Sequence, residues 1–107
     1  MIARIWRGAT RAADGDTYAE YIDATGLRAY KATPGNLGAY MLQRSVDAPE
    51  GRLAEFVVLS FWESMEAVER FAGADPTRAV FYPEDDRYLV RRELTVDHYH
   101  VVAPADG

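Results

Sequence analysis

The two histidines of the chain, His98 and His100, stand two residues apart in a segment that alternates like a β-strand. Side chains at that spacing point to one face of a strand, here together with the apolar Leu94, Val96 and Val102. Three interpretations are open: a metal-binding pair, a neutral imidazole that takes a proton from a bound substrate, and two histidines hydrogen-bonded at an interface or strand end. A metal would need a third ligand, and no local spacing supplies one, so we expect no metal.

Aromatic side chains form a second group that could do chemistry by lining a site. Trp62 and Phe56 share one face of an apolar segment, and four more rings follow in the second half of the chain: Phe71, Phe81, Tyr82 and Tyr88. Such residues usually form a core, although rings with a few polar groups among them are also typical of a pocket for a flat ligand.

Lone polar residues on apolar strands form a third group, made up of Ser60, Arg4 and Arg7. An arginine at a sheet edge usually lies along the surface with its guanidinium in water rather than clamping a carboxylate. We therefore expect Arg4 and Arg7 to be exposed.

The segment that must position these groups is 52–73, which predicts a strand, a turn and a helix. Its apolar run ends at Trp62 and is typical of a strand covered on both faces. Ser64 is placed to cap a helix that buries Ala67, Val68, Phe71 and Ala72 at three-and-four spacing. Glu66 and Arg70 are spaced to pair on its outer surface.

Other elements follow from periodicity and turn residues. A first strand is predicted at 2–10, a helix that starts at the capping-box pair Thr17 and Glu20 and ends before Pro34, and a second strand at 37–46. Turn residues at 47–51 predict a hairpin into the central strand. The remainder is expected to comprise a short helix at 74–82, a helical turn at 84–86, a last strand at 91–102 and a frayed tail at 103–107.

This order is β-α-β-β-α-β, the ferredoxin-like arrangement, with an extra helical segment before the last strand. The class is α+β, and residues 1–107 make a single domain. Helices cover one face of such a sheet, so apolar residues on the other face predict a homodimer in which a second copy supplies the missing layer.

Composition excludes several classes of function. The chain has no cysteine, which removes disulfides and thiol nucleophiles and favours a cytoplasmic protein. No apolar run approaches a membrane span, so we expect no membrane association. A net charge of −5 with scattered arginines argues against nucleic-acid binding. Phosphate-binding loops, dinucleotide fingerprints and the G-x-S-x-G and H-E-x-x-H motifs do not occur.

Residues 60–76 resemble the W-E-S…F…A-D-P pattern of the antibiotic biosynthesis monooxygenase family, and the element order resembles that family over nearly the whole chain. The resemblance implies a dimeric α/β barrel with a hydrophobic pocket between sheet and helices in each subunit. Members that oxidise phenols of polyketide pathways to quinones do so without a cofactor, because the substrate anion itself reduces dioxygen. The pocket tryptophan of those members matches Trp62.

Other family positions are changed. The asparagine, tyrosine and arginine of the quinone-forming members fall at Val58, Val68 and Tyr82. The tryptophan and histidine of the heme-degrading branch fall at Phe71 and Phe81, and the first strand has no asparagine, so heme cleavage is disfavoured.

The resulting hypothesis is a cofactor-independent monooxygenase acting on a small aromatic or polyketide-type substrate. Its alternatives are a cofactor-free cyclase, isomerase or lyase on the same scaffold, and a non-catalytic ligand-binding dimer. The candidate catalytic residues are His98, His100, Trp62 and Tyr82. The candidate substrate-binding residues are Phe56, Ser60, Phe71, Phe81 and Tyr88.

Overall fold

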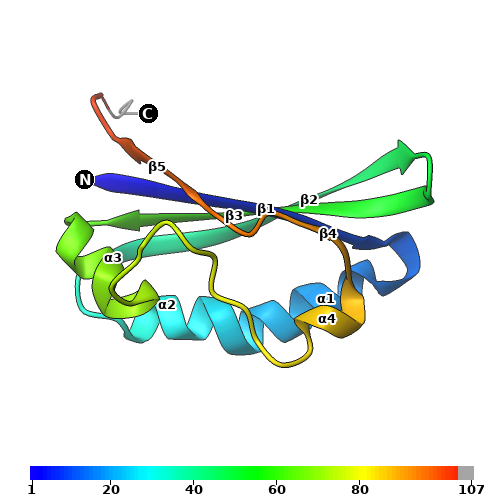
Figure 1. The fold of residues 1–107 in the computed structure, drawn as a ribbon, viewed down its shortest axis with the longest axis horizontal. Coiled ribbons are helices and arrows are strands. Elements are labelled where there is room, and N and C mark those ends of the chain that lie inside the picture. The colour runs from blue at the N-terminus through cyan, green and yellow to red at the C-terminus, as the bar shows by residue number, and fades with distance from the viewer. Residues whose placement is uncertain (104–107) are drawn as a thin grey trace.

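The computed structural model describes residues 1–103, in which a twisted antiparallel sheet carries all of the helices on one of its faces (Figure 1). The strands of this part are β1 (Ile2–Arg11), β2 (Asn36–Ala48), β3 (Gly51–Trp62), β4 (Leu89–Arg92) and β5 (Asp97–His100). Their order is β2-β3-β1-β4, and β5 also pairs with β1. This confirms the predicted ferredoxin-like fold. Residues 104–107 of the predicted tail lie outside the described residues.

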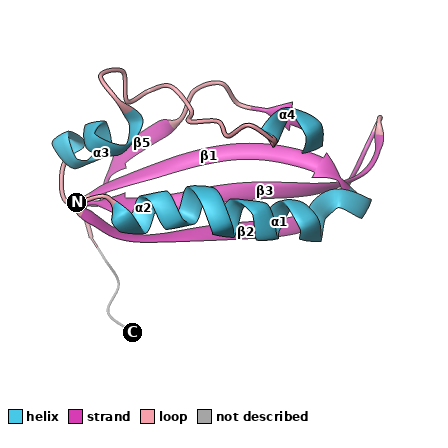
Figure 2. Cartoon of the chain, turned by 90° about the horizontal axis from the view of Figure 1, so that it is seen from below, coloured by secondary structure: helices cyan, strands magenta, loops and turns pink. Residues whose placement is uncertain are grey.

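The first helical segment runs along the sheet as α1 (Gly15–Ile22), a π-helical turn (Asp23–Leu27) and α2 (Arg28–Ala32), as seen in Figure 2. It starts earlier than the predicted capping box, because a turn of 3₁₀ helix at Ala12–Asp14 already leads into it. Thr17 therefore lies inside the helix and caps nothing. No helix within residues 1–103 is long and apolar enough to cross a membrane.

The strand–turn–helix unit at the centre of the chain forms as predicted. Ser64 Oγ accepts a hydrogen bond from the Ala67 amide at 3.2 Å and caps α3 (Met65–Ala72). The predicted Glu66–Arg70 pair is wrong, because Arg70 donates to the Pro34 carbonyl at 3.1 Å instead. This contact brings the turn before β2 against α3. A Cβ at Gly35, whose φ is +91°, would lie 2.5 Å from that of Ala67, so this close approach requires glycine.

The predicted last strand is divided in two. Gly8 faces Arg92 across β1 and β4, whereas Ile5 faces Asp97 across β1 and β5. Three residues along β1 thus correspond to five residues along the segment that runs from β4 into β5. Two extra residues therefore loop out between these two strands. The offset is even, so His98 and His100 keep to the same face of the sheet as Arg4 and Ile2, with which they pair.

The predicted helix at 74–82 is also wrong. Asp75 accepts hydrogen bonds from both the amide and the hydroxyl of Thr77, which holds a local turn in place of a helix cap. The chain then runs without regular structure, apart from a bridge between Arg78 and Thr95. We call residues 74–84 the covering segment, because it lies beside α3 on the helix side of the sheet (Figures 1 and 2). It ends at α4 (Asp85–Tyr88), close to the helical turn that was predicted.

Within residues 1–103, the other face of the sheet carries no helix or loop (Figure 1). By the strand register it presents Tyr40, Leu42, Leu59 and Tyr99. Tyr40 is 59% exposed and Leu42 50%, whereas Phe56 and Trp62 on the opposite face of β3 are fully buried. The expectation that β3 is covered on both faces is therefore not met within one subunit, although part of the face is apolar.

Candidate functional site

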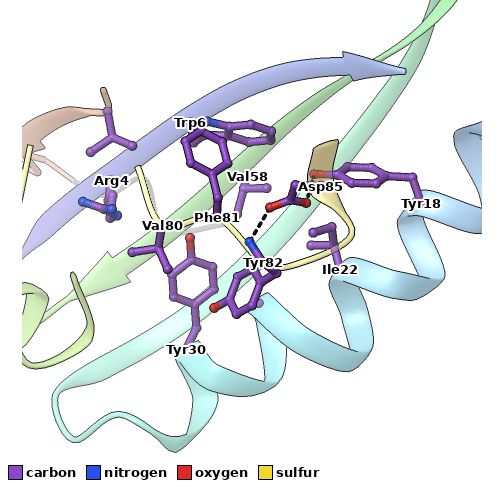
Figure 3. Close-up of a pocket in the computed structure, with 12 residues that line it drawn as sticks. Arg4, Trp6, Tyr18, Ile22, Tyr30, Val58, Val80, Phe81, Tyr82 and Asp85 are labelled. Atoms are coloured by element: carbon purple, nitrogen blue, oxygen red, sulfur yellow. Dashed lines mark hydrogen bonds between the residues drawn. The ribbon is translucent and has the colours of Figure 1, made fainter. Parts of the chain in front are cut away.

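A small cavity lies between the sheet, the α1–α2 helical segment and the covering segment (Figure 3). Its volume is about 30 Å³, which is room for about two water molecules. Five of its twelve lining residues are aromatic, and charged or hydroxyl groups occur at several points. The lining residues are Arg4, Trp6, Tyr18, Ile22, Gly26, Tyr30, Val58, Val80, Phe81, Tyr82, Asp85 and Val96.

The sheet contributes the polar head of Arg4 and the indole of Trp6 to the cavity. Both residues point to the helix face because they alternate along β1. The Trp6 ring lies over Gly8, where a Cβ would come within about 2.4 Å of it. Trp6 Nε1 donates to the Glu93 carbonyl at 2.8 Å, in the loop between β4 and β5. The absence of a side chain at position 8 leaves room for this ring, and the Glu93 carbonyl fixes its orientation.

Arg4 is buried, with 2% of its surface exposed, so the expectation that it lies in water is wrong. The physical reason is that β1 is an internal strand, and the covering segment closes over its helix face. Arg4 Nη1 donates to the Pro76 carbonyl at 2.6 Å, and Nη2 donates to the Arg78 carbonyl at 3.2 Å. Arg7, on the opposite face, is half-exposed as expected, and it pairs with Asp97 at 3.3 Å.

Burial lowers the pKa of Arg4 from its ordinary value, while the nearby Tyr30 opposes the shift. For Tyr30 itself, burial raises the pKa of the phenol, and the Arg4 charge opposes that shift. Burial also raises the pKa of Tyr82 to about 12. Both phenols therefore remain protonated near neutral pH and are able to donate hydrogen bonds.

The far end of the cavity holds a buried carboxylate. Asp85 is 2% exposed. Its oxygens accept hydrogen bonds from the Tyr18 hydroxyl at 3.0 Å and from the Tyr82 amide at 2.6 Å, and Figure 3 shows this pair of contacts on the side away from Arg4. Burial raises the pKa of Tyr18, and the Asp85 charge adds to the shift. The hydroxyl is thus fixed as a donor to the carboxylate.

The two predicted histidines differ in position. His98 is half-buried, and its Nε2 lies 3.1 Å from Arg4 Nη1, so it touches a residue of the cavity wall without lining the cavity. Burial lowers the pKa of His98, and the Arg4 charge lowers it further. His100 is exposed and does not line the cavity. Within residues 1–103, His, Asp and Glu side chains do not gather in a group of three that could hold a metal ion.

The other predicted site residues fall into two sets. Tyr82 and Phe81 line the cavity. Trp62 does not, because it is fully buried and donates from Nε1 to Ser60 Oγ at 2.9 Å. Its ring packs against Phe71 and Tyr30 with centroids 5.8 and 5.9 Å away. Phe56 and Tyr88 pack against Tyr18, behind the Asp85 end of the cavity. Tyr30 is thus the residue that connects the Trp62 cluster with the cavity.

Sequence reasoning did not assign five polar or aromatic residues of the cavity to the site: Arg4, Trp6, Tyr18, Tyr30 and Asp85. Tyr18 carried a usable signal, because it belongs to the inward stripe of the first helix. Arg4 carried one as well, since it shares a face with Ile2 and Trp6. Asp85 carried none, because it stands in an acidic run that is typical of a solvated turn.

None of the protein-family models matches the chain, and no curated protein sequence matches it. Solved structures do match its fold. A candidate antibiotic biosynthesis monooxygenase from Nitrosomonas europaea is 15% identical, with a TM-score of 0.65 over 96% of this chain and 100% of that one. A second such structure, from Bacillus cereus, is 17% identical, with a TM-score of 0.65 over 99% of this chain and 97% of that one.

A third match is the heme-degrader MhuD from Mycobacterium tuberculosis, in a structure with two hemes bound in its active site. It is 21% identical, with a TM-score of 0.52 over 99% of this chain and 100% of that one. The chain therefore has the fold of antibiotic biosynthesis monooxygenase-type structures. This is the fold that the resemblance at residues 60–76 predicted.

Proposed function

We propose that the chain belongs to the antibiotic biosynthesis monooxygenase family and acts as a cofactor-independent monooxygenase on a small aromatic or polyketide-type substrate. The observation that supports this most directly is the cavity between sheet and helices, which is walled by rings and furnished with a few polar groups. Such a composition suits a flat, mostly apolar ligand that is oriented by one or two hydrogen bonds. The fold shared with monooxygenase-type structures supports the same proposal.

The reaction would convert a phenol and dioxygen into a para-quinone and water. One oxygen atom replaces the ring hydrogen and the other leaves as water, so the electrons come from the substrate and no added reductant is needed. The protein has to remove the substrate from water, accept the proton that the ring carbon loses and keep the intermediate dry. Asp85 is placed to accept that proton, and Tyr30 and Tyr82 are placed to donate hydrogen bonds to oxygen atoms of the substrate.

Entry of an aromatic substrate requires the covering segment to move. A cavity of about 30 Å³ does not accommodate a six-membered ring. Phe81 and Tyr82 belong to the part of the wall that has no regular structure, and Tyr82 is held by its amide contact to Asp85. Their outward displacement would open the cavity without disturbing the sheet.

Heme does not fit this site. The residues that line the cavity include no histidine, and His98 already uses its Nε2 to contact Arg4. The positions that correspond to the tryptophan and histidine of the heme-degrading branch are occupied by Phe71 and Phe81. Although MhuD has the same fold, its chemistry is therefore not proposed for this chain.

A cyclase, isomerase or lyase is the alternative that the position of Asp85 favours. A buried carboxylate beside a ligand is able to shuttle a proton on a poly-β-keto substrate without oxygen. A ligand-binding dimer without turnover is the remaining alternative.

Two subunits are proposed to associate through the bare face of the sheet. The apolar side chains that it exposes, including Tyr40, Leu42 and Tyr99, form a continuous strip across β2, β3, β1 and β5. A second copy of the same face would bury this strip and supply the layer that a one-sided sheet lacks.

An oxygen electrode distinguishes these functions. Purified protein is mixed with hydroxylated anthrones and naphthols, and oxygen uptake is compared with quinone formation measured by absorbance. The monooxygenase predicts one dioxygen consumed for each quinone formed, above the background of the heat-denatured protein. A cyclase or isomerase predicts a new product with no oxygen uptake. Binding with neither product nor uptake contradicts both enzymatic proposals.

A further inference from the structure

The buried guanidinium of Arg4 has no carboxylate partner within residues 1–103, where the ion pairs involve other arginines. Burial of a charge is costly unless an opposite charge or a full set of hydrogen bonds compensates it. Arg4 is buried more completely than any other arginine in that range. Its positive charge is thus a feature of the cavity wall that the fold of the described residues does not neutralise.

The hydrogen bonds of Arg4 are also incomplete. A guanidinium carries five N–H donors. Nη1 uses two, for the Pro76 carbonyl and His98 Nε2, and Nη2 uses one, for the Arg78 carbonyl. The Nε–H has no partner within the described part of the chain although it is buried. One Nη2–H and the Nε–H therefore have no acceptor at full hydrogen-bond distance within residues 1–103, although the Tyr30 hydroxyl is near enough to interact with the guanidinium. A ligand oxygen that binds these donors would lie beside the Tyr30 hydroxyl, while three neutral groups hold the guanidinium in place.

The surroundings of these free donors define what would bind them. Aromatic rings surround Arg4: Tyr30 and Trp6 line the cavity with it, and behind the wall its guanidinium carbon lies 5.8 Å from the centre of the Phe71 ring. At the other end stands the Asp85 carboxylate (Figure 3). A ligand with a second negative charge at that end would be repelled. A planar ring with a single anionic oxygen at the Arg4 end would accept from Arg4 and would place no negative charge next to Asp85.

We propose that the cavity binds a planar aromatic compound as its phenolate, with the anionic oxygen held by the free Nε–H and Nη2–H of Arg4. This inference rests on the proposed function of the cavity as an aromatic site, and it adds the charge state of the ligand and the residue that selects it. A phenolate reacts with dioxygen far more readily than a phenol does, so Arg4 would hold the substrate in the reactive form.

The test uses para-nitrophenol, whose anion is yellow, and para-nitroanisole, its methyl ether, which cannot ionise. Both are titrated into the full-length protein at a pH below the pKa of free nitrophenol. A positive charge in hydrogen-bond contact with the ligand oxygen favours the anion. The ratio of anion to neutral nitrophenol should therefore rise at least about tenfold on binding. The visible absorbance of the phenolate reports this ratio directly.

Arg4→Met removes the charge and keeps the bulk of the side chain, and Arg7→Met is the matched control on the same strand but the opposite face. Arg4→Met should bind nitroanisole and lose the tenfold preference for the anion, whereas Arg7→Met should keep it. If Arg4→Met does not fold, as judged by circular dichroism, the comparison of the two compounds on the unaltered protein decides the question. Nitrophenol bound in its neutral form overturns the inference and leaves the aromatic site intact. Binding of neither compound overturns both the inference and the proposed function.

Discussion

Arg4 and His98 are joined across two neighbouring strands by a hydrogen bond of 3.1 Å, in which the arginine must be the donor. Since a guanidinium has no acceptor, His98 Nε2 carries no proton, and its ring is the neutral tautomer with the proton on Nδ1. A protonated His98 would lose this bond and place a second cation beside a buried one.

The first prediction concerns pH. The folded-state pKa of His98 lies below its ordinary value of 6.5, so the unfolded chain binds a proton more readily. The contribution of His98 to the free energy of unfolding should therefore be constant above pH 6.5 and should fall as the pH decreases from 6.5 towards the lowered pKa. Urea unfolding at several pH values across this interval measures the change in the free energy of unfolding. His98→Gln should flatten the profile, because an amide oxygen accepts from Arg4 without titrating, whereas the exposed His100→Gln should not. If both variants showed the same dependence of stability on pH, the dependence would not come from His98.

The second prediction concerns Asp85. Asp85→Ala removes both accepting oxygens, so the Tyr18 hydroxyl and the Tyr82 amide each lose a partner. Buried donors are left without acceptors, so the free energy of unfolding should decrease by about 1–3 kcal/mol. Guanidinium unfolding measures the loss. Asp86→Ala is the matched control: its side chain is 88% exposed and pairs with Arg92 on the surface, so a change within about 0.5 kcal/mol is expected. Equal effects of the two variants would mean that the Asp85 contacts contribute little.

The third prediction concerns Gly26, which lines the cavity from the middle of the helical segment. Gly26→Ala should raise helix stability by about 1 kcal/mol. Its new methyl group would lie 3.4 Å from Tyr82 Cε2, inside the space that a ligand would use. The variant should therefore melt at a higher temperature and bind para-nitroanisole more weakly. A more stable variant with unchanged affinity would place the ligand elsewhere.

The fourth prediction separates Trp62 from the cavity. Trp62→Phe removes the donor to Ser60 Oγ and leaves a gap in a fully buried cluster, so the free energy of unfolding should fall by about 2 kcal/mol. Because Trp62 does not line the cavity, the affinity for nitroanisole should change less than twofold. Phe81→Leu, in the cavity wall, is the comparison variant. Compared with Trp62→Phe, it should change the affinity for nitroanisole more and the free energy of unfolding less. The reverse pattern would restore Trp62 as a substrate contact.

The fifth prediction concerns association. Leu42→Asp places a charge on the bare face, in the edge strand β2, on a side chain that is 50% exposed in a single subunit. If two sheets face each other, sedimentation velocity should show a dimer for the unaltered protein and a monomer for the variant. Leu94→Asp introduces the same charge at an exposed leucine outside the strands and should leave the dimer intact. A monomeric unaltered protein would contradict the proposed dimer.

The fold was predictable because its elements are specified by local patterns. Period-two alternation placed β1 and β2, and Ser64 followed by an apolar stripe placed α3, since these signals lie within a few residues of each other. The element order then left few arrangements for the sheet. The helix predicted at 74–82 failed because the hydrogen bonds of Asp75 to Thr77 compete with a helix cap, which composition does not reveal.

The site was less predictable because its polar groups are buried by contacts between distant segments. Arg4 resembles a surface arginine until the carbonyls of Pro76 and Arg78, more than seventy residues away, close over it. Asp85 resembles a solvated acid until Tyr18 packs upon it. The two histidines were selected by residue type alone. Only the structure distinguishes them, because His98 is hydrogen-bonded to Arg4 and His100 is not.

The two residues that loop out between β4 and β5 control more than the register of the sheet. The loop around them accepts a hydrogen bond from Trp6 Nε1 at the Glu93 carbonyl and another from the Ala79 amide at the Leu94 carbonyl. The floor of the cavity and the segment above it are thus both attached to one short stretch of chain. Lengthening or shortening that stretch would alter the height of the cavity while β1 and its pairing with β3 stay unchanged. Proteins that share this sheet could therefore differ in the size of ligand they admit through insertions at this point, with no substitution among the residues of the sheet itself.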